Sequence, residues 1–250
     1  MSIRSHSLVV LGLVGALSGA CSDDGHTPTA PSTPSLPTST LAGSAPVALQ
    51  IAPPASRPRG RSYAAWAAEW WRWLLENPAT GSPILDPTGD QCGAHQPAEV
   101  WFLVGSFGGD PVVRRCTVPV GRPILVPLIN FGYFAFLSDD PSTRTEAFVR
   151  GQVRCIGDAE FARVELDGET VRDAARYLER SDLFQVQLPV DNLFGATADD
   201  IPDLLLSPSV DEGYYLFIQP LAAGEHVLRW QASSAACGFG QDITYRLTVH

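Results

Sequence analysis

The chain has 250 residues, a formal net charge of −10 and five cysteines. This length allows one large β domain or two small ones, and the acidic balance, without a basic stripe to neutralise phosphates, argues against nucleic acid as a partner. All 17 Lys or Arg residues are arginine, which excludes a pyridoxal phosphate Schiff base, a Walker lysine and a lysine general base.

The first residues have the pattern of a secretory signal. Arg4 and His6 precede an apolar run at residues 8–17, and small residues follow that run. The run is too short to span a membrane. We therefore interpret residues 1–20 as a signal peptide.

Two kinds of cleavage fit this signal. Ordinary signal peptidase would accept Ser18 and Ala20. Alternatively, the run LSGAC resembles a bacterial lipobox in which Cys21 receives a lipid, although Leu17 lies one position further from the cysteine than usual. Cysteine parity favours lipidation, because it leaves four cysteines to pair in an oxidising compartment. A plain secreted protein with a free thiol stays open.

Residues 21–61 are rich in Pro, Ser, Thr and Ala and contain few large apolar side chains. Such a composition cannot bury enough surface to fold alone. We expect a disordered tether that holds a folded domain away from a membrane or wall.

A tryptophan-rich helix is expected directly after the tether. Ser62 can cap it, alanines favour it, and Asn77 with Pro78 stops it, which predicts a helix over Tyr63–Glu76. Its aromatic side chains recur at helical spacing. They would either form a platform for stacking sugars or cover one side of a β-sheet, and the second is the commoner role of such a stripe. The tryptophans are Trp66, Trp70, Trp71 and Trp73.

Three consecutive strands are expected around residues 92–131. Residues 100–107 are apolar and aromatic, and residues 108–111 (GGDP) favour a hairpin loop. Val112–Val118 alternates, and residues 124–131 are nearly all apolar, as in a strand buried on both faces. Pro127 lacks an N–H and so predicts a bulge or an edge position.

Four cysteines remain for disulfides. Cys92 and His95 form a C-x-x-H pair, but four zinc ligands cannot be assembled from the sequence. We expect neither a metal nor a cofactor. Three disulfide pairings are possible; we prefer Cys92–Cys116, clipping the first hairpin, with Cys155–Cys237 tying the middle of the chain to its end.

The second half of the chain predicts further strands and short helices. Together with the first half it gives a mainly β fold, namely a β-sandwich or jelly-roll-like domain over residues 62–250, with the tryptophan-rich helix and one or two additional short helices. The expected elements are helices at 143–156 and 173–179, strands at 161–166, 169–171, 184–188, 214–219, 226–231 and 243–249, and a loop at 192–210.

Several motifs in order resemble a family of bacterial extracytoplasmic proteins to which no activity is assigned. They are W-x3-WW-x-W, then D-x3-D-x-C, VWFLVGSFGG, R-x-C-TVP-x-G and PLIN. The resemblance covers residues 66–130 well and later segments loosely. It implies a secreted domain and carries no catalytic residue with it.

Asp86, Asp90, His95 and Asn130 are polar residues around the expected core and are our candidates for lining a pocket. The alternative for Asp86 and Asp90 is that they make hydrogen bonds within turns.

Two functions follow. The first is a membrane-tethered, non-enzymatic module that binds a glycan or an envelope protein, which predicts an exposed tryptophan or a large apolar patch. The second is a secreted hydrolase with a non-standard site near Asp90, His95 and Asn130, which requires these side chains to converge in one cleft. No catalytic motif is present, so the first is preferred. The expected location is extracytoplasmic, lipid-anchored through Cys21 or otherwise secreted.

Overall fold

A computed structural model of the chain describes residues 50–250. The predicted signal peptide, the lipidation at Cys21 and residues 21–49 of the predicted tether lie outside the described residues. The described part is mainly β and forms two five-stranded sheets with a tryptophan-rich helix packed on one of them. The predicted fold class is therefore confirmed.

The elements fall into strands, α-helices and short 3-10 helices. The strands are β1 (Trp101–Phe102), β2 (Val112–Val118), β3 (Ile124–Phe136), β4 (Glu160–Leu166), β5 (Glu169–Thr170), β6 (Leu178–Arg180), β7 (Phe184–Gln187), β8 (Leu205–Ile218), β9 (Gly224–Ser234) and β10 (Phe239–Val249). The α-helices are α2 (Tyr63–Glu76) and α3 (Glu146–Gln152). The 3-10 helices are η1 (Pro58–Gly60), η2 (Pro141–Arg144), η3 (Arg154–Asp158), η4 (Ala174–Tyr177) and η5 (Pro202–Leu204).

One sheet, which we call sheet A, has the strand order β1-β3-β8-β6, with β7 also paired to β8. The other, sheet B, has the order β2-β10-β9-β4-β5. Consecutive strands β1, β2 and β3 thus alternate between the sheets. β1 pairs in parallel with β3, and β2 pairs in parallel with β10. The predicted hairpin at residues 108–111 is therefore wrong.

The reason lies in the segment after β1. Leu103 still donates its N–H to Leu125 in sheet A, but Val104 then bonds the Tyr245 hydroxyl of β10. Ser106 continues this crossing by bonding the Gln241 side chain. The apolar run at 100–107 therefore leaves one sheet for the edge of the other, and only its first part is a strand.

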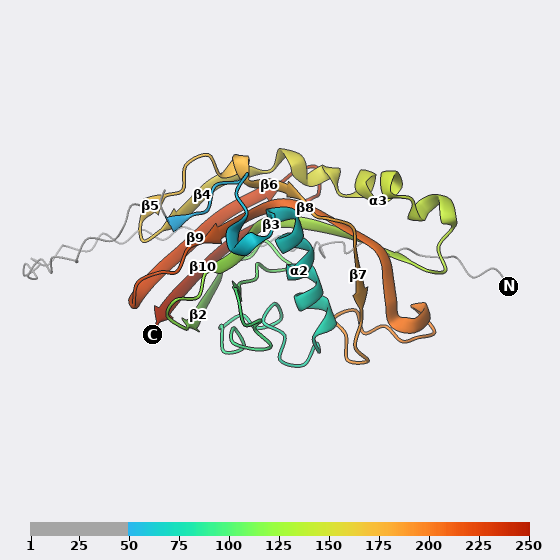
Figure 1. The fold of residues 1–250 in the computed structure, drawn as a ribbon, viewed down its shortest axis with the longest axis horizontal. Helices are drawn as coiled ribbons and strands as arrows, with labels where there is room; N and C mark the ends of the chain where they lie inside the picture. The colour runs from blue at the N-terminus through green and yellow to red at the C-terminus, as the bar shows by residue number, and fades with distance from the viewer. Residues whose placement is uncertain (1–49) are drawn as a thin grey trace, which may run out of the picture.

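Sheet A has a different partner on each face (Figure 1). One face packs against sheet B at one end, and α3 covers the other end of the same face through Tyr133, Val149 and Val210. α2 covers the opposite face, beneath the long curved strands β3 and β8 (Figure 1). β3 has a bulge between Pro127 and Ile129, as expected from Pro127. After this bulge, Asn130 lies on the face of β3 that α2 covers.

The helix α2 has the bounds that its sequence predicts. The Ser62 hydroxyl accepts the Ala65 N–H at its start, and the backbone turns extended at Asn77 before Pro78. Its indoles pack on sheet A, so the aromatic stripe covers a sheet rather than forming an exposed platform. All six tryptophans of the chain are at most 8% exposed, so the exposed tryptophan expected of a binding module is not found.

Residues 50–61 were expected to belong to the tether, and this boundary needs correction. Ile51 is buried and pairs with Ile218 at the end of β8, and the Ala52 N–H bonds the Phe217 carbonyl. The Tyr63 hydroxyl in turn donates to the Ala52 carbonyl. The composition of residues 21–61 did not reveal this, because only Ile51 and Ala52 are needed to extend the sheet at the end of β8. These residues belong to the folded unit.

Two disulfides join Cys92 to Cys116 and Cys155 to Cys237, which is the preferred pairing. The first ties the loop before β1 to β2, so it does not clip a hairpin. The second ties η3 to the connection between β9 and β10. Two disulfides indicate an oxidising, extracytoplasmic compartment. Within residues 50–250, the helices are too short or too polar to cross a membrane.

Candidate binding site at an aromatic cavity

A cavity of about 60 Å³ lies where α2, β3, β10 and the segment after β1 meet. Its wall consists of aromatic rings, uncharged polar side chains, glycines and the aliphatic side chain of Ile84. The aromatic residues are Trp70, Trp71, Phe107, Phe131 and Phe239, and the polar ones are Ser106, Asn130 and Gln241. Among residues 50–250, no charged side chain belongs to this wall.

Four of the rings form two pairs, one within α2 and one between β3 and β10. Trp70 and Trp71 of α2 meet edge to face with centroids 5.1 Å apart, and Phe131 and Phe239 join β3 to β10 with centroids 6.2 Å apart. Phe107 is 43% exposed and belongs to the same wall. The cavity is thus lined by aromatic rings from four separate parts of the chain.

Two glycines in sheet A make room for this arrangement. A Cβ atom on Gly132 would lie 3.0 Å from the Trp71 ring and 2.6 Å from the Phe134 ring. A Cβ atom on Gly213 would lie 2.3 Å from the Cβ atom of its cross-strand partner Asn130. The missing side chains therefore let an indole and an amide lie close to the sheet.

A chain of hydrogen bonds leads from the cavity wall into the protein. The Asn130 Nδ2 atom donates to the Tyr215 hydroxyl at 2.9 Å, and this hydroxyl donates to Asp211 Oδ2 at 2.7 Å. Because the amide nitrogen is engaged with Tyr215, the Asn130 Oδ1 atom remains as an acceptor, and no hydrogen bond occupies it among those of the described residues. The chain ends at a carboxyl group that has no contact with solvent.

The Asp211 carboxyl group is held by neutral donors and not by a cation. Desolvation by burial raises the pKa of Asp211 to about 7, against the lowering effect of hydrogen bonds from Trp71, Tyr215 and Asn130. The Trp71 Nε1 and Asp211 Oδ1 atoms are both buried and neither has a partner at ordinary hydrogen-bond geometry. The Trp71 indole therefore lies near the Asp211 carboxyl group as a weak donor.

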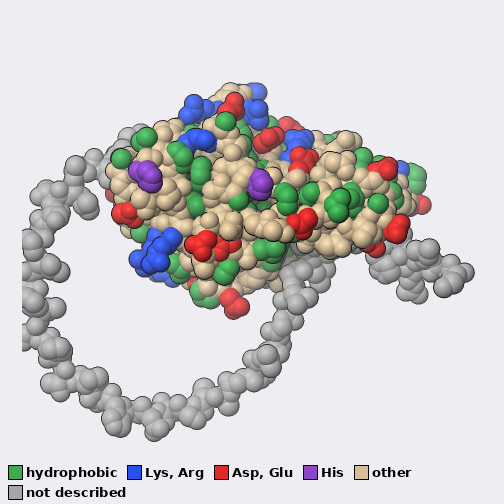
Figure 2. All heavy atoms as spheres, turned by 90° about the horizontal axis from the view of Figure 1, so that it is seen from below, with side chains coloured by type: hydrophobic (Ala, Val, Ile, Leu, Met, Phe, Trp, Pro, Cys, Tyr) green, Lys and Arg blue, Asp and Glu red, His purple; other side chains and the backbone are tan. Residues whose placement is uncertain are grey.

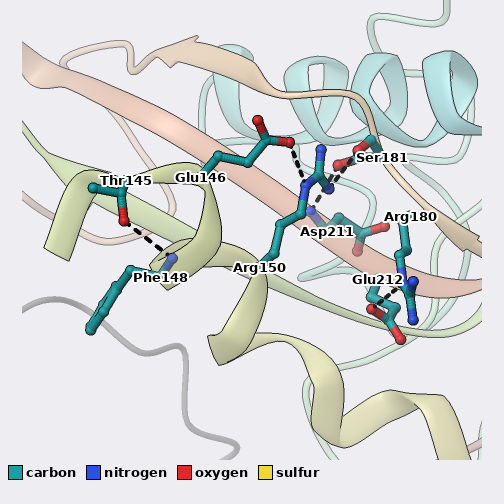
Figure 3. A network of polar contacts seen from close by, with 8 residues as sticks. All are labelled: Thr145, Glu146, Phe148, Arg150, Arg180, Ser181, Asp211 and Glu212. Atoms are coloured by element: carbon teal, nitrogen blue, oxygen red, sulfur yellow. Dashed lines mark hydrogen bonds and ion pairs between the residues drawn. The ribbon is translucent and has the colours of Figure 1, made fainter. Parts of the chain in front are cut away.

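The arginines around Asp211 are engaged elsewhere (Figure 3). Arg150 bonds Glu146 at 2.7 Å and the Ser181 carbonyl at 3.1 Å, while Ser181 holds only the backbone of Asp211, accepting its N–H at 2.8 Å and donating to its carbonyl at 2.9 Å. The neighbouring Glu212 pairs with Arg180 at 2.9 Å. Asp211 itself forms no ion pair within the part of the chain that the structure describes.

The rim of the cavity is fixed by a two-way contact between Ser106 and Gln241. The Ser106 N–H donates to Gln241 Oε1 at 2.8 Å, and Gln241 Nε2 donates to the Ser106 carbonyl at 2.7 Å. Behind this rim, the buried Arg114 donates to the carbonyls of Val104 and Gly105. The guanidinium charge of Arg114 is therefore separated from the cavity by carbonyl oxygens.

Of the four predicted pocket residues, only Asn130 lines the cavity. The Asp86 carboxylate accepts bonds from Thr88 and Gln91 inside a turn; burial alone would raise the pKa of Asp86, but these bonds outweigh it and lower the pKa. The Asp90 side chain is exposed. The His95 carbonyl accepts the indole Nε1–H of Trp73 at 2.9 Å. The structure does not bring Asp90, His95 and Asn130 together, so the hydrolase alternative has no assembled site.

Sequence reasoning missed Asp211 and Tyr215. Residues 192–210 were expected to be a loop, which placed Asp211 just outside a strand, whereas β8 begins at Leu205. The sequence feature that could have revealed them is the two-residue spacing of Asp211, Gly213 and Tyr215, which places all three on the face of β8 that packs against α2. Pro208 within the run concealed it.

No family model, no curated protein and no solved structure matches this chain. Among the described residues, no three His, Cys, Asp or Glu side chains are grouped so that they could hold a metal ion. One face of the molecule carries acidic and basic side chains scattered among larger uncharged areas (Figure 2).

Proposed function

We propose that the protein is a membrane-tethered extracytoplasmic module without enzymatic activity, and that it binds a glycan or an envelope protein through the aromatic cavity. The observation that carries the proposal is the cavity itself. An apolar pocket with a few convergent polar groups and a carboxyl group of perturbed pKa is the usual form of a small-ligand site.

The size of the cavity sets what enters it. One water molecule needs roughly 10–15 Å³ of cavity volume. The cavity of about 60 Å³ therefore accommodates a group of four or five heavy atoms. The cavity therefore takes one end group of a larger ligand. The remainder of the ligand would lie on the surface beside Phe107.

The chemistry of the wall favours binding over catalysis. General acid–base catalysis needs a titratable group within hydrogen-bond reach of the substrate. The polar groups at this wall are amides and the Ser106 hydroxyl, and that hydroxyl donates to the Gly108 carbonyl at 2.6 Å. Such groups orient a ligand without transferring protons.

The tether is supported by cysteine use. Four of the five cysteines form the two disulfides, so Cys21 in the lipobox-like run LSGAC is the one left over. Lipidation of Cys21 would give this thiol a role and hold the domain at a membrane. The resemblance to bacterial extracytoplasmic proteins points the same way.

A glycan array probed with the full chain tests the binding function. The Ser106→Leu variant places a larger side chain in the cavity wall, and Ser142→Leu makes the same change at an exposed position of η2. We expect Ser106→Leu to lose the glycan signal and Ser142→Leu to keep it. For an envelope protein, a photo-crosslinker at Phe107 should give one adduct that Ser106→Leu removes. Binding that survives in Ser106→Leu would contradict the proposal.

A further inference from the structure

We propose that the aromatic cavity recognises a quaternary ammonium group, with Asp211 as the buried counter-charge behind the wall. This inference rests on the proposed function, since it names the chemistry of the group that enters the same cavity. It is carried by three features together: the rings, the unpaired carboxyl group and the shortage of hydrogen-bond acceptors at the wall.

The rings provide the first argument. A cation is attracted to the negative face of an aromatic ring, and cages of several rings are the usual recognition site of methylated ammonium groups. Five of the residues that line the cavity are aromatic, and they come from α2, β3, β10 and the segment after β1. A neutral apolar ligand would need no charge behind such a wall.

The second argument is the carboxyl group. Asp211 is buried without an arginine partner, and burial of an unpaired carboxylate is costly. Two of the groups that contact it, Asn130 and Trp71, also line the cavity. A cation bound between the rings would therefore lie one residue away from this carboxyl group and would favour its ionised form.

The third argument separates a quaternary from a primary ammonium. A primary ammonium carries three N–H donors, each of which needs an acceptor when it is buried. The Asn130 Oδ1 atom is free to accept, whereas Gln241 already bonds Ser106 through both of its side-chain atoms. A trimethylammonium group needs no hydrogen bonds, and its heavy atoms match the space of about 60 Å³.

The charges that face this region have opposite effects on a bound cation. Arg114 lies behind the Gly105 carbonyl, and its positive charge disfavours a bound cation. Its guanidinium group donates hydrogen bonds to the carbonyl oxygens of Val104 and Gly105, which lie between it and the cavity. Around Asp211 lie Glu212 on the same strand, Tyr215, and Arg150 of α3, which reaches it only through Ser181. The pKa of Tyr215 is raised well above 10 by burial first and by Asp211 second, so this phenol stays neutral.

Choline and its neutral isostere 3,3-dimethylbutan-1-ol provide the test, because they differ in charge and hardly in shape. Binding to the full chain is followed by titration calorimetry and by the indole N–H signals in a nitrogen-15 spectrum. We expect choline to bind about tenfold or more tightly than the isostere, as a desolvated cation–π site would give, and methylammonium to bind more weakly than choline. Binding of choline should shift the Trp71 signal.

Asp211→Asn removes the charge and keeps the shape, and Asp90→Asn makes the same change at an exposed site. We expect Asp211→Asn to lose the preference for choline and Asp90→Asn to keep it. Equal binding of choline and the isostere with a shift of Trp71 would overturn the inference and leave the proposed binding site in place. Binding of neither, or binding unaffected by Ser106→Leu, would count against both. The comparison of the two ligands on the unmodified chain stands even if a variant fails to fold.

Discussion

The Nδ1 atom of His226 lies 2.7 Å from a carboxylate oxygen of Asp167, at the end of sheet B where the β4–β5 turn meets β9. The other ring nitrogen lies 2.9 Å from the Ala222 carbonyl oxygen. Both partners are acceptors, so both nitrogens of His226 must donate, and the imidazole that fits this site is the protonated one.

This geometry predicts that part of the stability is lost at alkaline pH. Burial alone would lower the pKa of His226, but the bonds to Asp167 and Ala222 outweigh it and raise the pKa. A raised pKa in the folded state means that the contribution is complete below the unfolded pKa of about 6.5. It disappears as the pH rises through the higher folded value. Urea unfolding between pH 5.5 and 9 should show this decline.

The His226→Gln variant isolates the effect. Glutamine keeps a donor and an acceptor at this position but cannot titrate, so its stability curve should be flatter than that of the unmodified chain over the same range. Equal slopes for the two proteins would show that folding does not change the pKa of His226.

The raised pKa of Asp211 predicts that the free energy of unfolding also changes with pH in the acidic range. Desolvation raises its pKa from 3.8 to about 7, so between these values the unfolded chain releases a proton that the folded protein keeps. The free energy of unfolding should therefore fall from pH 4 to pH 7 and level off above it, by an amount on the order of 1–4 kcal/mol. Asp211→Asn should show a smaller decline in urea unfolding. If both proteins decline equally, Asp211 titrates normally.

Local features of this fold were predictable from the sequence because their causes are local. Ser62 and Asn77 delimit α2 through capping and through a following proline, and the Asp167-Gly168 turn between β4 and β5 places both residues at positive φ, as an Asp-Gly hairpin favours. The preferred cysteine pairing also agreed with the structure, although the reason given for Cys92–Cys116 did not.

The pairings between distant strands were not predictable, and the site depends on them. β2 pairs with β10 from the opposite end of the chain, and no local pattern records such a register. The cavity needs Phe239 and Gln241 from β10 beside Trp71 from α2. Asn130 was identified because it is polar within an apolar run. The importance of Asp211 could not be inferred until β8 was known to extend past it.

Gly132→Ala should destabilise the protein by overpacking. Its Cβ atom would meet the Phe134 ring at 2.6 Å and the Trp71 ring at 3.0 Å, and forcing extra carbon into a packed region costs about 1–3 kcal/mol. The Trp71 indole signal should also move. Gly108→Ala is the matched control, since nothing lies within 4 Å of its added carbon. Similar losses in both variants would show that backbone effects, and not crowding at Trp71, cause the change.

The two disulfides should differ in their contribution to stability. Cys155–Cys237 spans 82 residues and Cys92–Cys116 spans 24, and the loop-entropy relation gives the longer one an advantage of about 1 kcal/mol. Replacing each pair by alanine and measuring urea unfolding without reductant should therefore show the larger loss for the variant without Cys155 and Cys237. The opposite order would mean that the Cys92–Cys116 bridge acts mainly in the folded state, where it holds the loop before β1 against β2.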